Sequence, residues 1–153
     1  EKFHVEQTPF GFQKAEDSHG FLLWQTTNIW QQKVKKALAK FGISHQQFVI
    51  MATLLWFEMH GYNTMYKNIA QWAKLDKMTV SAALQALLAD NLVVVTEHKL
   101  DARAKAPSLS PKGKRLITKL IPIVEDIDRQ FFGPLTESAQ QDLLVILRQL
   151  VQD

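Results

Sequence analysis

Residues 64–113 constrain the fold of this 153-residue chain more than any other stretch. Two short helical patterns lie on either side of Leu75-Asp76, and Asp76 can cap the second helix because its carboxylate accepts from first-turn amides. The second pattern places apolar residues on one face at helical spacing: Val80, Leu84, Leu87 and Leu88. Asn91 then suits a left-handed helix end, and the β-branched run 93–96 follows at once. This order of helix, turn, helix, strand, loop and strand predicts a winged helix-turn-helix over 64–110.

The outward face of the second helix carries no charge. At about 100° per residue, the outward positions are Met78, Ala82, Gln85 and Ala89, with Thr79 and Ser81 on the flanks. Small, neutral and hydrogen-bonding side chains fit against the base edges of a DNA groove. The candidate DNA contacts on this helix are therefore Lys77, Met78, Thr79, Ser81, Ala82 and Gln85. The alternative interpretation is a tolerant surface helix with no partner.

The loop between the two predicted strands concentrates positive charge. Lys99, Arg103 and Lys105 surround one carboxylate, that of Asp101. An arginine on a hairpin tip can enter a minor groove, where the negative potential is strong. Asp101 can hold that guanidinium by a bidentate contact, which leaves the two lysines for phosphates. These four residues complete the candidate DNA-binding set.

These motifs together resemble the MarR family of transcriptional regulators. The resemblance rests on the D-x-R of Asp101 and Arg103, on the Leu-Ser-Pro-Lys-Gly run at 109–113 and on the Thr-Val-Ser at 79–81. It extends over nearly the whole chain as a pattern of six helices and one wing. One departure is that Ala82 and Ala86 stand where recognition helices of the family often carry Arg or Lys.

We expect residues 1–153 to form a single, mainly α-helical domain with a small β wing. Long helices over 18–61 and 111–152 flank the winged helix and carry more apolar surface than one small domain can bury. Such faces typically pair with a second copy of the chain. The MarR resemblance implies the same arrangement, a two-fold homodimer in which the terminal helices intertwine. A dimer would place two recognition helices in successive major grooves of a pseudo-palindromic operator.

The charge of the chain is uneven. The net charge is only +3, but residues 65–119 have a balance of +6 and residues 120–153 a balance of −4. The positive block coincides with the winged helix, where phosphates would have to be met. There is no cysteine, no apolar run long enough to span a bilayer and no visible signal peptide. The expectation is a soluble, cytoplasmic protein without a membrane partner.

The resemblance also implies an effector cavity where the dimerisation helices meet the winged helix. Trp24, Trp30 and Trp56 lie on the helices that would flank this cavity, and the matching positions include Gln25, Asn28 and His45. The candidate ligand contacts are Trp24, Gln25, Asn28, His45 and Trp56. An aromatic wall with amide and imidazole groups would suit a small planar or phenolic compound. The alternative is that these tryptophans belong to the core and that His45 is an exposed first-turn residue.

Other classes of function find less support in the sequence. There is no Gly-rich phosphate loop, HExxH motif, nucleophile elbow or clustered acid pair, so we expect no catalytic residues and no cofactor. None of the five histidines forms an i, i+4 pair, which argues against a metal site. We therefore predict a sequence-specific, double-stranded DNA-binding regulator, a repressor relieved by a small aromatic molecule. The alternatives are a winged helix used for protein contacts and a metal sensor.

Overall fold

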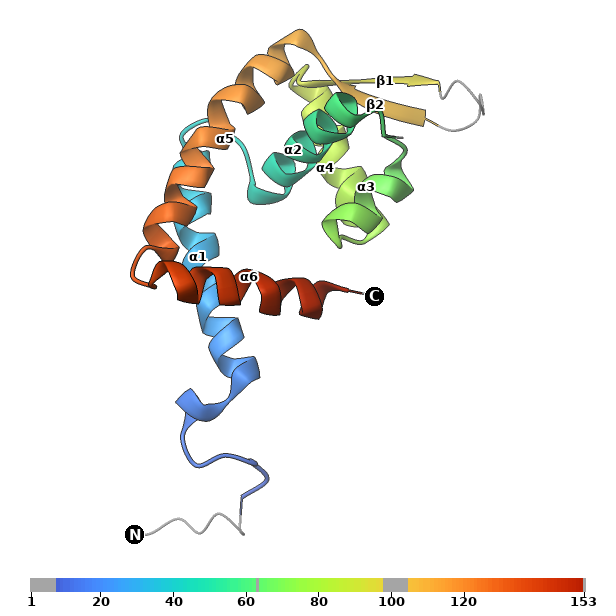
Figure 1. Cartoon of the computed structure of the whole chain (residues 1–153). Coiled ribbons are helices and arrows are strands. Elements are labelled where there is room, and N and C mark those ends of the chain that lie inside the picture. The colour runs from blue at the N-terminus through green and yellow to red at the C-terminus, as the bar shows by residue number, and fades with distance from the viewer. Residues whose placement is uncertain (1–7, 63, 98–104, 153) are drawn as a thin grey trace.

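The structure is a computed structural model that describes residues 8–62, 64–97 and 105–152. A short 3-10 turn at Ala15–Asp17 precedes the first long helix. The elements in chain order are helices α1 (His19–Ala39), α2 (His45–His60), α3 (Tyr66–Ala73) and α4 (Lys77–Ala89), strands β1 (Val93–Glu97) and β2 (Lys105–Leu109), and helices α5 (Pro111–Phe132) and α6 (Glu137–Val151) (Figure 1). This confirms the predicted fold class of a mainly helical chain with a two-stranded wing.

Helix α2 lies at the centre of the fold. It contacts α1, α3, α4, α5 and β2, as its nearly all-round apolar sequence requires. Around it lies one hydrophobic core, whose fully buried side chains include Val34, Leu38, Ile50, Met51, Leu54, Ile69, Val80, Leu84, Leu87, Ile117 and Leu120. The winged helix-turn-helix is therefore fixed to the long helices through a shared core.

Strands β1 and β2 form an antiparallel pair with Val93 opposite Leu109 and Glu97 opposite Lys105. The amide of Ser110 donates to the carbonyl of Leu92 at 3.0 Å and extends the ladder by one step towards α5. The backbone N–H and C=O groups of alternate residues in β2 point away from β1. Pro107 and Leu109 are two of these residues, so the missing N–H of Pro107 removes no hydrogen bond between the strands.

Side chains close in sequence cap the ends of the helices. Ser44 and Gln47 form a reciprocal capping box at the start of α2, and Thr136 accepts from Ala139 N at 3.1 Å at the start of α6. Asn91 has φ of 59°, the left-handed conformation predicted for the residue after α4. These local signals set the lengths of the helices that position the outer face of α4.

The two terminal helices leave much apolar surface uncovered. No residue of α6 is buried, and α6 turns away from the end of α5 and crosses in front of α1 in Figure 1. Its exposed apolar side chains are Leu144, Val145, Ile146, Leu147, Leu150 and Val151. The first half of α1 likewise exposes Phe21, Leu22, Leu23 and Trp24. None of the described helices is long and apolar enough to cross a membrane.

Candidate nucleic-acid interface

The outer face of α4 is exposed and free of charge. Val80, Ala83, Leu84 and Leu87 are buried against the core, which fixes the rotation of the helix about its axis. Met78 is 83% exposed, and Ala82, Gln85 and Ala89 are exposed beside it. Ser81 is partly buried on the flank, and Lys77 is exposed in the first turn. A rigid helix thus presents one amide, one thioether and small side chains to solvent.

Asp76 holds the start of α4. Its carboxylate accepts from the amide of Thr79 at 2.7 Å and from the hydroxyl of Thr79 at 2.9 Å. The hydroxyl proton of Thr79 is therefore used within the protein, and a DNA group could only donate to that oxygen. Hydrogen bonds from the amide and then the hydroxyl of Thr79 lower the pKa of Asp76 from its ordinary value of 3.8.

Asp76→Asn should make unfolding less dependent on pH in acid. Because folding lowers the pKa of Asp76, its stabilisation is complete above the unfolded-state value of 3.8 and is lost as pH falls through the lower folded-state value. Asparagine keeps an oxygen that can cap the helix, but its side chain does not bind a proton as pH falls. Urea midpoints measured at several pH values below about pH 4 test this. Equal pH dependence in the variant and the original protein would contradict it.

The turn between α3 and α4 contains a lysine in an unusual conformation. Lys74 has φ of 57°, and the amide of Leu75 donates to the carbonyl of Ala70 at 3.0 Å to close the end of α3. A left-handed residue other than glycine is uncommon and costs free energy. The side chains of Lys74 and Lys77 are both exposed around this turn.

Ser110 and Gly113 join the wing to α4 and α5. The hydroxyl of Ser110 donates to the carbonyl of Asn91 at 2.6 Å, and its oxygen accepts from the amide of Gly113 at 2.9 Å. Lys112 Nζ donates to the carbonyl of Asp90 at 3.1 Å. The Leu-Ser-Pro-Lys-Gly run therefore joins the end of α4 to the start of α5 through these hydrogen bonds.

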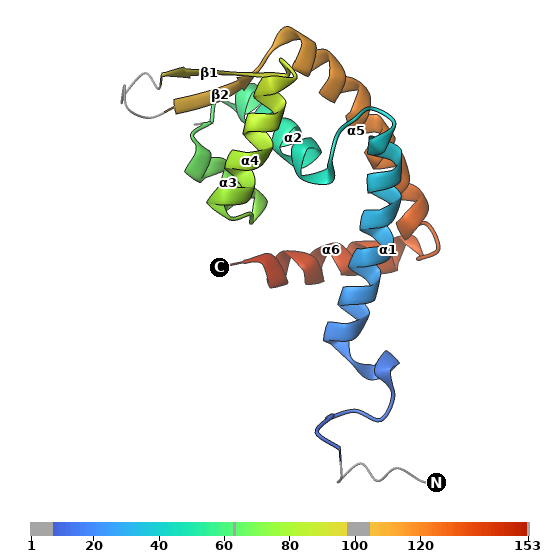
Figure 2. The ribbon, with the colours of Figure 1, turned by 180° about the vertical axis from the view of Figure 1, so that it is seen from behind.

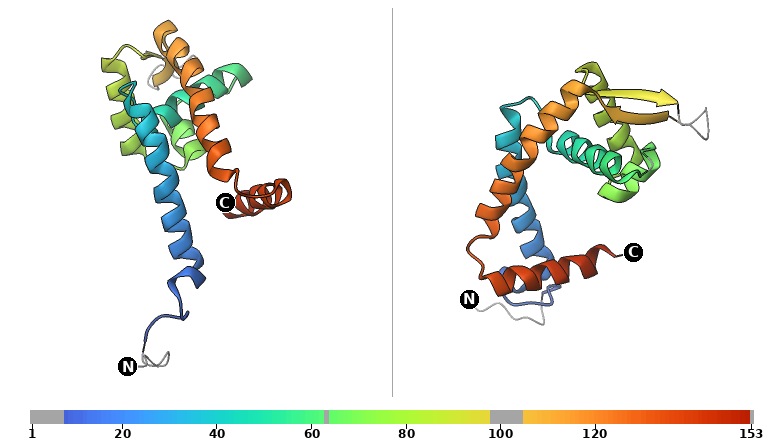
Figure 3. Two further views of the ribbon diagram at one scale, coloured as in Figure 1. Left: turned by 90° about the vertical axis from the view of Figure 1, so that its left-hand side faces the viewer. Right: turned by 45° about the horizontal axis from the view of Figure 1, so that its top comes forward.

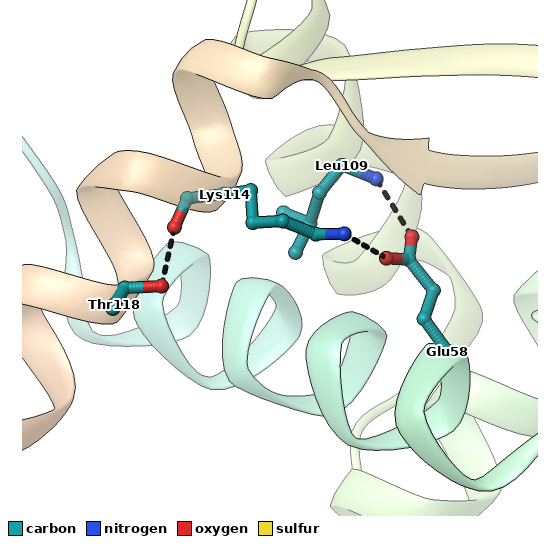
Figure 4. Close-up of polar contacts among 4 residues, drawn as sticks. All are labelled: Glu58, Leu109, Lys114 and Thr118. Atoms are coloured by element: carbon teal, nitrogen blue, oxygen red, sulfur yellow. Dashed lines mark hydrogen bonds and ion pairs between the residues drawn. The ribbon is translucent and has the colours of Figure 1, made fainter.

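Glu58 of α2 anchors the outer edge of the wing. Its Oε1 accepts from the amide of Leu109 at 3.0 Å, and its Oε2 lies 4.0 Å from Lys114 Nζ (Figure 4). Glu58 is not among the site residues predicted from the sequence. The available signal was that it is the only carboxylate on an otherwise apolar central helix.

The predicted wing contacts Lys99, Asp101 and Arg103 lie outside the described residues. Lys105 is the first residue of β2, opposite Glu97. The role of the wing in DNA binding therefore stays a prediction.

A hollow of about 520 Å³ lies between α1, the first turns of α2 and the turn before α4. Its wall consists of Asn28, Trp30, Gln31, Gln32, Lys35, Ser44, His45, Gln46, Val49, Ala73 and Leu75.

The hollow contains two of the predicted ligand residues, Asn28 and His45, on its wall. Trp24, Gln25 and Trp56 do not line it. Trp24 is 66% exposed on α1, Gln25 is exposed beside it, and Trp56 stacks on His60 with centroids 4.2 Å apart. Within one chain, neither Trp24 nor Trp56 is a core residue. For these two residues, the alternative that the tryptophans belong to the core also differs from the structure.

Of the three tryptophans expected beside the cavity, Trp30 is the one that lines the hollow. Its indole N–H donates to Asp128 Oδ1 at 2.8 Å, and its ring meets His45 edge-on at 5.1 Å. Burial lowers the pKa of His45, and the charge of Asp128 opposes part of that shift. His45 is thus neutral near pH 7 and can donate or accept one hydrogen bond. In the described part of the chain, no three His, Cys, Asp or Glu side chains gather as a metal site would need.

The sequence matches known winged-helix proteins. Residues 39–127 match the family model of the ArnR1-like winged-helix domain. YdcH, an uncharacterized HTH-type transcriptional regulator of Bacillus subtilis (strain 168), is 36% identical over 122 residues, which are 80% of this chain and 83% of the relative.

Solved structures share the whole architecture. BpsR of Bordetella bronchiseptica, whose DNA binding is regulated by 6-hydroxynicotinic acid, superposes with a TM-score of 0.83 at 20% identity, over 94% of this chain and 99% of that one. MepR of S. aureus in complex with DNA gives 0.78 at 20% identity, over 88% and 96%. A MarR-family regulator from Rhodococcus sp. RHA1 gives 0.79 at 19% identity, over 91% and 96%. At these identities the likeness establishes the fold.

Proposed function

Because the chain belongs to the ArnR1-like winged-helix family of HTH-type transcriptional regulators and shares its fold with a MarR-family regulator, we propose that it is a MarR-type homodimeric repressor of a pseudo-palindromic operator, relieved by a small aromatic ligand. Proteins of this family regulate transcription and are not enzymes. The observation that carries the proposal is the exposed, charge-free outer face of α4. We further propose that 1–153 acts as one domain, with 64–110 binding DNA and with 18–61 and 111–152 forming the core and the dimer.

The outer face of α4 suits a major groove with A·T pairs. Gln85 can bond bidentately to adenine, and Met78 and Ala82 can contact thymine methyl groups. Ser81 on the flank can donate to a base edge or a phosphate. In the wing, Arg103 would enter the minor groove with Asp101 as its partner, while Lys99 and Lys105 would contact phosphates. Lys77 would do the same at the start of α4.

The uncovered apolar surface of α1 and α6 supports the homodimer. Leu150 is 69% exposed and Trp24 is 66% exposed, so both surfaces are largely uncovered within the described part of one chain. A second copy of the chain is the partner whose own uncovered helices match. Two copies would present two recognition helices to half-sites one helical turn apart.

Selection of bound sequences from a random duplex pool tests the DNA-binding proposal. The expected result is an inverted repeat whose half-sites are centred about 10 bp or a multiple of it apart, with A·T pairs at the steps that face Gln85. An enriched pool without a repeat, or with G·C at those steps, would contradict it. A protein-interaction module would enrich no sequence.

The hollow beside His45 is the proposed ligand site. Trp30 offers an aromatic wall, Asn28 and His45 offer hydrogen bonds, and Lys35 offers a positive charge. This chemistry fits a small aromatic compound with a phenol or carboxylate group.

Binding of such a ligand should quench Trp30 fluorescence and lower the affinity for DNA, and DNA should lower the affinity for the ligand by the same factor. A Trp30→Phe variant separates this signal from that of the other tryptophans, and no response to phenols or aromatic acids would oppose the proposal.

A further inference from the structure

The second half of α1 lies on the same face of the molecule as the recognition helix. In Figure 2, α1 lies in front of α5, and α4 lies in front of α2. The left view of Figure 3 agrees, because α4 and the end of α1 that leads to α2 lie towards one side while α6 lies towards the other. A long partner that binds the outer face of α4 can therefore also reach this part of α1.

The surface between α1 and α4 is polar and positive. The hollow described above separates them, and Lys35 of α1, Gln46 of α2 and Leu75 of the turn lie on its wall. There is no carboxylate among its lining residues. Lys35 is exposed and has no ion pair in the part of the chain that the structure describes. Lys74 and Lys77 lie on either side of the exposed carboxylate of Asp76, so the turn at the start of α4 carries a net positive charge.

Helix geometry separates Lys35 from its lysine neighbours. Val34 and Leu38 are fully buried and point into the core. At about 100° per residue, Lys35 projects to the flank that it shares with Asn28 and Gln31, both of which line the hollow. Lys33 projects to the opposite flank, about 200° away from Lys35. Both lysines are exposed and lie on the same helix, so Lys33 is a matched control.

The direction of the wing indicates which part of the operator this surface meets. In Figure 1 the wing points away from α1, α5 and α6, and α4 lies between the wing and α1. DNA that passes from the wing across α4 therefore continues over α1 towards the dimerisation helices. In a two-fold dimer that direction leads to the centre of the operator.

We propose that Lys35 is a phosphate contact that holds the DNA backbone of the operator spacer, between the two half-sites read by α4. This inference rests on the proposed function and adds a binding surface outside the winged helix. The contact is sequence-independent, because a lysine neutralises phosphate without reading a base. It gives the protein affinity for the spacer and favours half-sites at the correct separation.

The test compares Lys35→Ala, Lys33→Ala and the original protein on the selected operator, with affinity measured over a range of salt concentrations. One lost phosphate contact per protomer should reduce the salt slope by roughly two units per dimer. Between about 50 and 200 mM salt, the original protein should then lose about tenfold more affinity than Lys35→Ala. Lys33→Ala should match the original protein, and neither substitution should change the selected base sequence. Thermal unfolding checks that both variants remain folded.

Neutral methylphosphonate linkages locate the contact. Placed in the spacer, they should weaken binding of the original protein and of Lys33→Ala but leave Lys35→Ala unchanged, because the contact is already absent. The same number of linkages outside the half-sites should affect all three proteins equally. Equal behaviour of the two variants, or a response of Lys35→Ala to spacer linkages, would overturn the proposal while sequence-specific binding remains. Failure of the original protein to prefer any duplex would refute the proposed function itself.

Discussion

Replacing Gly113 with alanine is expected to lower the free energy of unfolding by about 3 kcal/mol or more. A Cβ at this position would overlap the carbonyl oxygen of Leu92 and would stand 2.9 Å from its carbonyl carbon. These are backbone atoms that cannot rotate aside. The same oxygen accepts the hydrogen bond from the Ser110 amide, so relief of the overlap would break the base of the wing. Urea unfolding followed by circular dichroism measures the loss.

Gly20→Ala is the control for Gly113→Ala. Gly20 also lies in a helix, but a Cβ there would meet nothing within 4 Å. Alanine should therefore stabilise the protein, by at most about 1 kcal/mol, through helix propensity and a less flexible unfolded chain. Similar effects of the two substitutions would contradict the close packing of α5 on Leu92.

Ile146→Glu in α6 should weaken the homodimer more than a hundredfold. Ile146 is 50% exposed in one chain and lies in the middle of the uncovered apolar surface of α6. Burying an unpaired carboxylate at the interface should cost about 3–5 kcal/mol, which is at least two decades in the dimer Kd. Operator affinity should fall with it, because a monomer holds one half-site. Sedimentation equilibrium over a concentration series measures the Kd.

Gln141→Glu provides the same added charge on the far side of α6. Gln141 is exposed and precedes Ile146 by five residues, about 140° around the helix. The dimer Kd of this variant should stay close to that of the original protein. If Ile146→Glu remained dimeric at nanomolar concentration, the proposed interface would be misplaced.

Local hydrogen-bonding signals made much of the fold predictable. Three helices are capped by a side chain that accepts from the amide three residues later: those of Asp76, Ser44 and Ser110. The two partners of each bond therefore lie close together in the sequence. The apolar spacing of Val80, Leu84 and Leu87 likewise fixes which side of α4 faces the core. The exposed face of α4 follows from the same pattern.

Features that depend on tertiary packing were not predictable in this way. Lys74 occupies a left-handed position that sequence rules give to Gly or Asn, because the packing of α3 against α4 sets the turn. The hydrogen bond from Leu109 to Glu58 joins residues 51 positions apart. The hollow contains Trp30 and not Trp24 because six residues rotate a helix by about 240°. The wing tip lies outside the described residues, so its predicted contacts stay predictions.

The ratio of two dissociation constants tests the central claim most directly. The protein is titrated with the selected operator and with a duplex of the same composition in shuffled order, at a salt concentration of about 0.15 M. The protein should bind the operator at least about 1,000-fold more tightly than the shuffled duplex. Gln85→Ala should lose roughly 1–3 kcal/mol of that discrimination for each bidentate contact removed. Equal affinity of the original protein for the two duplexes would contradict sequence-specific reading by α4.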